Sequence, residues 1–245
     1  MQHFFTKIEF LSDEKFGKIT EKSIINQFTK ILRGKIGDKI FVLDGKGGKF
    51  LCEIIGIEKK FFEIKILEKI FLDKEKFFSD DKNFGGNKKI NLFFALPKSK
   101  EKFEFILQKG TELGVCEFHP FFSDFCNAKY PNKIERNNLI IKEASEQSER
   151  FFLPKLKDFN KFEKIFDEKE KFYFFDSRGE NLKSQFDIIK NGGYPQEINL
   201  IIGPEGGFSE KEVQTAKEKN CEFLTLGTNI LRLETAIICA ISRIL

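Results

Sequence analysis

The hydrophobic period of this chain changes partway along its length, and that change limits the folds it can adopt. Up to about residue 70, short runs such as HFFTKIEF and FFEIKILEKI alternate apolar with polar residues, which is typical of half-buried β-strands. From residue 90 onward, continuous apolar runs such as INLFFAL alternate with segments of helical spacing. Strands with both faces buried have such runs, in parallel sheets covered by helices. The sequence therefore predicts a small β-barrel over residues 1–71 and an α/β domain over residues 90–245.

The boundary between the two patterns falls in a charged segment. Residues 72–89 read LDKEKFFSDDKNFGGNKK, with a Gly-Gly-Asn turn signal near the end, so we expect a linker there. Within the barrel, DGKGG at residues 44–48 predicts a hairpin turn, and SIINQFTKILR at residues 23–33 predicts a short helix. A phosphate-binding loop is the alternative for DGKGG, and the missing Lys-Ser/Thr pair argues against it.

In the second half, apolar strands and helix-sized segments alternate. Phe103, Ile106, Leu107 and Gly110 recur at helical spacing in KEKFEFILQKGTELG, and NKIERNNLIIKEASEQSERF is a second predicted helix. The predicted strands are INLFFAL, EFHPFF, KFYFFD, INLII and CEFLTL. This order predicts a mostly parallel sheet with helices on both faces.

Composition excludes several classes of site. The five cysteines are scattered without a CxxC pair, and there are two histidines, which argues against a zinc centre and a Ser-His triad. We expect reduced thiols, no metal, no membrane association and a cytoplasmic protein, because neither a signal peptide nor a membrane-length apolar run is present. The net charge of +4 permits nucleic-acid binding without requiring it. Lysine is the usual cation in this sequence. The few arginines are therefore candidates for contacts in which the planar guanidinium binds a phosphate, a carboxylate or a base edge.

The segment IIGPEGGFSEKEV, residues 201–213, joins a predicted strand to a predicted helix through glycines. Ser209 and Glu212 have the spacing of a capping box, with Phe208 and Val213 at the flanking staple positions. Glycines without a Cβ let a ligand approach the backbone N–H groups closely. The spacing matches neither a Walker loop nor a dinucleotide fingerprint. Taken alone, the segment could be only a structural turn.

A second glycine turn follows directly. The predicted strand ends at Leu226, residues 227–229 turn the chain, and a nearly apolar helix is predicted from Ile230 to the C-terminus, with Asn229 as its cap. Two successive strands that end in glycine turns at one sheet edge predict one pocket lined by both loops. The apolar surface of the last helix also suits a subunit interface.

These two motifs together, LIIGPEGGFSEKEV and LGTNILRLETA, resemble the paired signature of the RsmE-type ribosomal RNA methyltransferases, which methylate N3 of a uridine in small-subunit ribosomal RNA. The segments FALPKSKEKFEFILQKGTELGV, EASEQSERFFLP and FTKILRGKIGDKIFVLDGKGGKF extend the resemblance over most of the chain. The resemblance implies a PUA-like β-barrel followed by a SPOUT domain with a C-terminal trefoil knot near residues 198–245. It further implies S-adenosylmethionine as methyl donor, a homodimer, and 16S rRNA in the 30S subunit as substrate.

Specific residues follow from the resemblance. The donor is expected to contact Ile202, Gly203, Gly206 and Gly207 of the first loop and Leu226, Gly227, Ile230 and Leu231 of the second. RNA is expected to contact Lys30, Arg33 and Lys35 of the barrel, together with Lys98 and Arg150. The chain departs from the family pattern at Asn229, where an arginine is common, and at Leu233, where a threonine is common.

Methylation at N3 requires loss of the N3 proton, so the site needs charge stabilisation and a proton acceptor. The candidates are Arg232 for charge and Glu205 or Glu234 for the proton. Glu234 has two other interpretations: a carboxylate favoured by the helix dipole, or one that only positions Arg232. Two other functions stay open, a non-catalytic RNA-binding or assembly factor and a nucleotide-binding enzyme that uses GPEGG for phosphate.

Overall fold

The computed structural model describes residues 1–11, 13–79, 88–126, 128, 130, 132–166, 171–181 and 197–245. The chain divides into two compact units. The first contains Met1–Phe77 with Ser145–Leu153, and the second contains Phe78–Ala144 with Pro154–Leu245. Each unit has its own hydrophobic core.

The inclusion of Ser145–Leu153 in the first unit differs from the expected organisation, which placed all of residues 90–245 in one domain. Glu146 accepts a hydrogen bond from the backbone N–H of Phe5 at 2.8 Å. Phe152 forms a β-bridge with Lys46 in the predicted hairpin turn. These contacts depend on residues far apart in sequence, so the helical spacing of residues 132–151 could not indicate them.

The described part of the first unit forms a six-stranded sheet in the order β1-β4-β5-β6-β3-β2, antiparallel except for the parallel pair β1–β4. The strands are β1 (Gln2–Phe5), β2 (Glu9–Phe10), β3 (Phe16–Ile19), β4 (Lys39–Leu43), β5 (Gly48–Ile57) and β6 (Phe62–Phe71). The predicted turn is confirmed, with the Asp44 carboxylate accepting from the N–H groups of Lys46 and Gly48. The predicted helix is present as α1 (Lys22–Asn26) and a π-helical turn η1 (Gln27–Ile31).

The expected linker, residues 72–89, is described only in part. Its residues Lys74–Ser79 form a short helix, α2. Residues 80–87 of this prediction lie outside the described residues.

The second unit contains the predicted parallel sheet. Its strands lie in the order β10-β8-β7-β12-β11-β13, with β9 paired to β8, and all the described pairings are parallel. The strands are β7 (Lys89–Ala95), β8 (Val115–Phe122), β9 (Lys155–Leu156), β10 (Asn160–Lys161), β11 (Phe172–Asn181), β12 (Glu197–Ile202) and β13 (Glu222–Thr225). The helices are α3 (Lys100–Glu112), α4 (Ile134–Gln147), the 3₁₀ turn η2 (Phe162–Lys164), α6 (Glu210–Glu218) and α7 (Leu233–Ile244).

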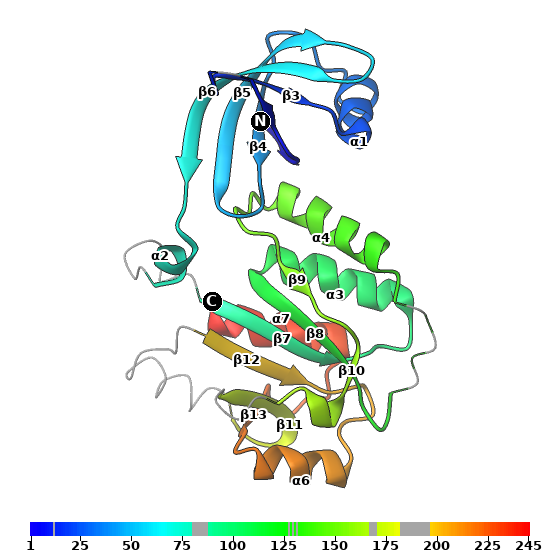
Figure 1. Cartoon of the computed structure of the whole chain (residues 1–245). Helices are drawn as coiled ribbons and strands as arrows, with labels where there is room; N and C mark the ends of the chain where they lie inside the picture. The colour runs from blue at the N-terminus through cyan, green and yellow to red at the C-terminus, as the bar shows by residue number, and fades with distance from the viewer. Residues whose placement is uncertain are drawn as a thin grey trace. The chain divides into compact units, whose positions relative to one another are not determined.

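Helices cover both faces of this sheet, with α3 and α7 on one side and α6 on the other (Figure 1). Along β7, Leu92 and Phe94 pack with α3 and α7, whereas Phe93 packs in a second cluster with Val213 of α6. Both faces are therefore buried, which explains the continuous apolar run of this strand.

The order of the strands decides where their loops meet. β7, β12, β11 and β13 are successive neighbours and run parallel, so the loops that follow them emerge at one edge of the sheet. In open α/β sheets this carboxyl edge is where ligands bind. The trefoil knot expected near residues 198–245 stays a prediction.

Candidate functional site

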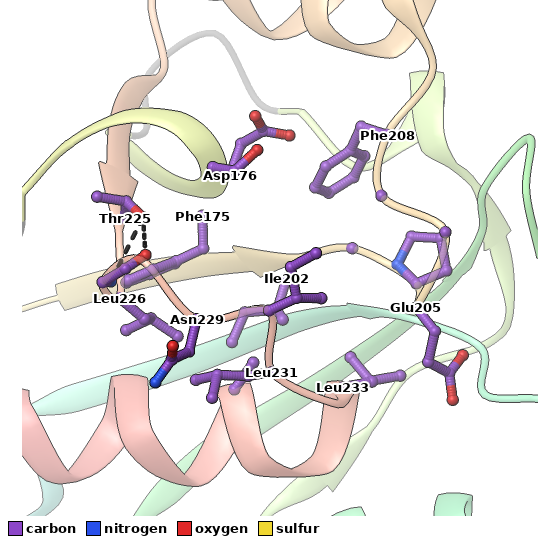
Figure 2. A pocket seen from close by; sticks show the side chains of 18 of the residues that line it. Phe175, Asp176, Ile202, Glu205, Phe208, Thr225, Leu226, Asn229, Leu231 and Leu233 are labelled. Carbon is purple, nitrogen blue, oxygen red and sulfur yellow. Dashed lines mark hydrogen bonds between the residues drawn. The ribbon is translucent and has the colours of Figure 1, made fainter.

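A cavity of about 300 Å³ lies at the carboxyl edge of the parallel sheet (Figure 2). Three stretches of chain line it: residues 175–177 within β11, the loop that follows β12, and the loop that follows β13. Two α7 residues, Leu233 and Ala236, complete the lining. We call residues 203–208 the first loop and residues 226–232 the second loop.

The sequence predicted that these two loops share one pocket, and the structure confirms their meeting. The lining includes every residue expected to contact the donor: Ile202, Gly203, Gly206, Gly207, Leu226, Gly227, Ile230 and Leu231. Glu205 also lines the pocket, whereas Arg232 and Glu234 flank the lining residue Leu233. The role of these residues in donor binding stays a prediction.

Residues 175–177 of β11 form the wall that sequence reasoning missed. Phe175, Asp176 and Ser177 line the pocket there. The pairing of β11 with β13 shifts register between Phe175 and Glu180, so the residues between them form an excursion beside the pocket. The available signal was Asp176 itself, the carboxylate that ends the predicted apolar strand KFYFFD.

Asp176 is held by an arginine of the same excursion. Its carboxylate accepts from the Arg178 backbone N–H at 2.9 Å, from Nε at 2.6 Å and from Nη2 at 2.9 Å. Nη1 of the same arginine donates to Glu210 at 2.7 Å. Burial raises the pKa of Asp176, but the hydrogen bonds from Arg178 outweigh burial, and the net pKa is lowered. The carboxylate is therefore ionised and paired at neutral pH.

The first loop ends in the predicted capping box, which is confirmed. The Ser209 hydroxyl accepts from the Glu212 N–H at 3.2 Å, and the Glu212 carboxylate accepts from the Ser209 N–H at 2.9 Å. The other Glu212 oxygen accepts from the N–H of Asp124, whose carboxylate accepts from the Ser209 hydroxyl at 2.6 Å. Phe208 and Val213, the predicted staple pair, are buried in the same core cluster. The loop is thus fastened to the segment after β8.

Each glycine of the first loop is needed at its position for a different physical reason. A Cβ at Gly203 would lie 2.5 Å from the ring of Phe208, and one at Gly206 would lie 3.3 Å from Cβ of Phe125. Gly207 has φ +74°, and its N–H donates to the carbonyl of Pro204 at 2.9 Å. A tight turn packed on aromatic rings therefore forms this wall.

The second loop leads into α7, and here two predictions are wrong. The helix begins at Leu233 rather than Ile230, because the backbone of Arg232 is extended, with φ −65° and ψ 152°. Arg232 therefore occupies the N-cap position and makes no side-chain capping bond, so Asn229 is not the cap. Leu231, directly before Arg232, lines the pocket.

Glu234 does not position Arg232, which corrects another of the predicted alternatives. Its carboxylate pairs instead with Lys102 of α3, at 3.4 Å. Within the part of the chain that the structure describes, Arg232 forms no ion pair and its side chain is exposed. The arginine is free to meet a ligand or a partner.

Glu205 also pairs with Lys102, at 2.6 Å. Burial raises the pKa of Glu205, but hydrogen bonds from Lys102 and from the backbone outweigh burial and leave the pKa lowered. The pKa of Lys102 is raised, chiefly by the hydrogen bond to Glu205. A carboxylate with a lowered pKa is a weaker proton acceptor, which counts against Glu205 as the base.

The residues expected to contact RNA lie in both units. In the first unit Lys30, Arg33 and Lys35 are exposed around the end of η1, and Arg150 is half-buried in the segment Ser145–Leu153. In the second unit Lys98 is exposed between β7 and α3, near the carboxyl edge of the sheet.

Two further observations bear on cofactors and location. Among the described residues, no group of three or more His, Cys, Asp and Glu side chains could hold a metal ion. Over the same residues, no helix has the length and apolarity needed to span a bilayer.

Burial raises the pKa of the Cys52 and Cys221 thiols to about 12, so neither is a reactive thiolate at neutral pH.

Comparison with known proteins agrees with this geometry. Residues 86–245 match the family described as "RNA methyltransferase domain", and residues 28–67 match the "RNA methyltransferase PUA domain". "Ribosomal RNA small subunit methyltransferase E" of Buchnera aphidicola subsp. Schizaphis graminum is 32% identical over 234 residues, which cover 90% of this chain and 87% of the relative. The protein of the same name from Bacillus subtilis is 29% identical, covering 90% of this chain and 86% of the relative.

Among solved structures, a ribosomal RNA small subunit methyltransferase E from Neisseria gonorrhoeae, bound to S-adenosyl methionine, matches with a TM-score of 0.79 and 27% identity. The match covers 100% of this chain and 96% of that protein.

Proposed function

This chain belongs to the family of ribosomal RNA small subunit methyltransferases E, and on that basis we propose that it transfers a methyl group from S-adenosylmethionine to small-subunit ribosomal RNA. The observation that carries the proposal is the pocket: both glycine loops of the family motifs line one cavity at the carboxyl edge of the sheet. The solved relative from Neisseria gonorrhoeae was crystallised with S-adenosyl methionine, which supports the same donor here.

The residues present suit this donor. A cavity of about 300 Å³ has the size of a small-molecule site. Glycine turns in both loops allow close backbone contact, and apolar side chains such as Ile202, Leu226 and Leu231 can pack against the adenosyl group. When bound, S-adenosylmethionine supplies an electrophilic methyl group on a positively charged sulfur.

We assign N3 of a uridine in 16S rRNA as the methyl acceptor. The new bond joins the methyl carbon to N3, the bond from sulfur to methyl breaks, and the N3 proton leaves to an acceptor. Arg232, exposed directly after the pocket residue Leu231, is assigned to stabilise negative charge on the uracil. Of the two predicted carboxylates, Glu234 is the better acceptor, because Lys102 binds Glu205 at the shorter distance.

The remaining assignments concern partners. We propose a cytoplasmic homodimer that acts on the 30S subunit, with the outer surface of α7 at the subunit interface. The first unit is proposed to contact RNA phosphates through Lys30, Arg33 and Lys35, together with Arg150, while Lys98 contributes beside the pocket.

The test is methyl transfer from labelled S-adenosylmethionine to ribosomal RNA, 30S and 70S particles, followed by mapping of the modified base. We expect label at N3 of one uridine, with 30S particles as the best substrate. Donor binding without any transfer to the three substrates would favour the non-catalytic RNA-binding factor. Calorimetric preference for ATP over S-adenosylmethionine would favour the nucleotide-binding enzyme instead.

A further inference from the structure

Lys102 of α3 differs from other lysines of its helix in the partners it contacts. Lys100 pairs with Glu104 at 2.9 Å and Lys109 pairs with Glu112 at 2.8 Å, both within α3. The ammonium of Lys102 instead lies between two carboxylates from distant parts of the sequence, 2.6 Å from Glu205 and 3.4 Å from Glu234. We call these three side chains the Lys102 bridge.

The two carboxylates belong to different walls of the pocket. Glu205 lies in the first loop, between the lining residues Pro204 and Gly206. Glu234 lies in the first turn of α7, directly after the lining residue Leu233. The Lys102 bridge therefore connects the first loop to the start of α7 through a third element, α3.

The burial of the bridge makes it stronger than a surface ion pair. The side chains of Lys102 and Glu205 are each 30% exposed and that of Glu234 is 18% exposed. Water screens such charges only in part, so both attraction and repulsion among them are larger than at a fully exposed site. Both carboxylates lie within ion-pair distance of one nitrogen, so without it they would repel each other.

We propose that Lys102 is a positioning residue, which holds the turn at residues 204–207 against the start of α7 and so keeps the pocket shaped for the methyl donor. This inference rests on the proposed function of the pocket. Loss of the ammonium leaves two neighbouring carboxylates unpaired, the turn moves away from α7, and donor contacts in the first loop are lost. Lys102 does not itself line the pocket, so its effect on donor affinity is indirect and acts through the position of the first loop.

The experiment compares donor affinity by calorimetry in the full-length wild type and two single variants. Lys102→Met is expected to bind S-adenosylmethionine about tenfold more weakly, or by about 1.4 kcal/mol, because the first loop loses its hydrogen bond to the ammonium. Lys100→Met is the matched control, because it removes an ion pair of the same helix that reaches neither loop. Turnover of Lys102→Met should show a raised KM for the donor, whereas Lys100→Met should keep the KM of the wild type.

A double variant separates positioning from direct contact. In Lys102→Met/Glu205→Gln the repulsion between carboxylates is gone, so donor affinity should rise from that of Lys102→Met to about that of Glu205→Gln alone. If Lys102 acts instead by touching donor or RNA, the second substitution restores nothing, and the positioning role is overturned. Glu205→Gln alone keeps the test available should Lys102→Met fail to fold: a several-fold loss of affinity supports the bridge, and wild-type affinity contradicts it.

The wild type distinguishes this inference from the proposed function. If the wild-type protein neither binds S-adenosylmethionine nor methylates ribosomal RNA, the proposed function fails. If the wild type does both and Lys102→Met binds the donor as Lys100→Met does, the proposed function stands and the Lys102 bridge has no positioning role.

Discussion

The two loops of the pocket are held in very different ways. The first loop has Phe208 buried in the core, the capping box of Ser209 at its end, and Glu205 paired with Lys102. The second loop has local bonds between Thr225 and Gly227, while the side chain of Ile230 is 93% exposed. Figure 2 shows the two loops on opposite sides of the pocket.

This difference separates two tasks that one pocket has to perform. A wall that is rigid before binding reduces the entropy lost when a small ligand is ordered. A wall with few buried contacts opens at low free-energy cost and can adapt to a second, larger partner. We therefore assign donor recognition chiefly to the first loop, and contact with RNA or a second subunit to the second loop and Arg232. Four predictions test this division, from the largest expected effect to the smallest.

The largest effect is on stability. Phe208→Ala should lower the free energy of unfolding by about 3–5 kcal/mol, because the ring packs among Phe121, Phe162 and Phe174. Ile230→Ala should change it by less than about 0.5 kcal/mol, because its side chain is exposed. Urea denaturation measures both. Equal losses in the two variants would remove the contrast between the loops.

The second prediction concerns Arg232 at the end of the second loop. Arg232→Lys keeps the positive charge but loses the planar guanidinium. Turnover should therefore fall on the order of a hundredfold, which is about 2.7 kcal/mol of activation free energy. Donor affinity and melting temperature should stay near wild type, because Arg232 makes no ion pair within the described residues. Arg243→Lys, an exposed arginine of the same helix, is the control. Wild-type turnover in Arg232→Lys would remove this residue from the mechanism.

The third prediction concerns donor binding by the first loop. Gly206→Val should weaken donor affinity about tenfold while leaving the fold intact, because a branched side chain would occupy a pocket-lining position. The new Cβ would also lie 3.3 Å from Cβ of Phe125, so residue 125 would have to shift by a few tenths of an ångström. Thr228→Val, which keeps the side-chain volume at a pocket-lining position of the second loop, should change donor affinity much less. Full affinity in Gly206→Val/Phe125→Gly, which removes the Cβ atom at residue 125, would mean that the single variant acts through Phe125 rather than in the pocket.

Local patterns allowed much of the fold and both loops of the site to be predicted. The capping box of Ser209 and Glu212 is a four-residue signal, and alternating strands and helices predicted the parallel sheet that brings both glycine loops to one edge. These features depend on residues close in sequence or on the general rule for parallel strands.

The features that sequence reasoning missed depend on distant contacts. Lys102 meets Glu205 and Glu234 only after α3, the first loop and α7 have packed together. The excursion at Asp176 depends on the register between β11 and β13. The start of α7 was misplaced because Asn229 is a usual capping residue, yet the extended residue before the helix is Arg232, and the first helical residue is the buried Leu233.

The smallest expected effect is the pH dependence of stability, because the two loops differ in their titratable groups. Residues 226–231 of the second loop contain none, whereas the first loop contains Glu205, whose pKa the folded protein lowers despite its burial. A carboxylate with a lowered pKa stabilises the fold above its unfolded pKa, and that contribution is lost as the pH falls through the folded value. The raised pKa of Lys102 adds stability that is complete at neutral pH and disappears only in strong alkali.

We therefore expect Glu205→Gln to destabilise the protein by about 0.5–1 kcal/mol near neutral pH, because the pair is partly exposed. This difference from wild type should shrink toward zero as the pH is lowered through the carboxylate range, since the wild type then loses the same charge. Thr228→Ala in the second loop should differ from wild type by an amount that does not change with pH. Urea denaturation across the acid range checks both variants. A pH-independent difference for Glu205→Gln would show that Glu205 contributes packing rather than charge, and the first loop would then be held by Phe208 and the capping box alone.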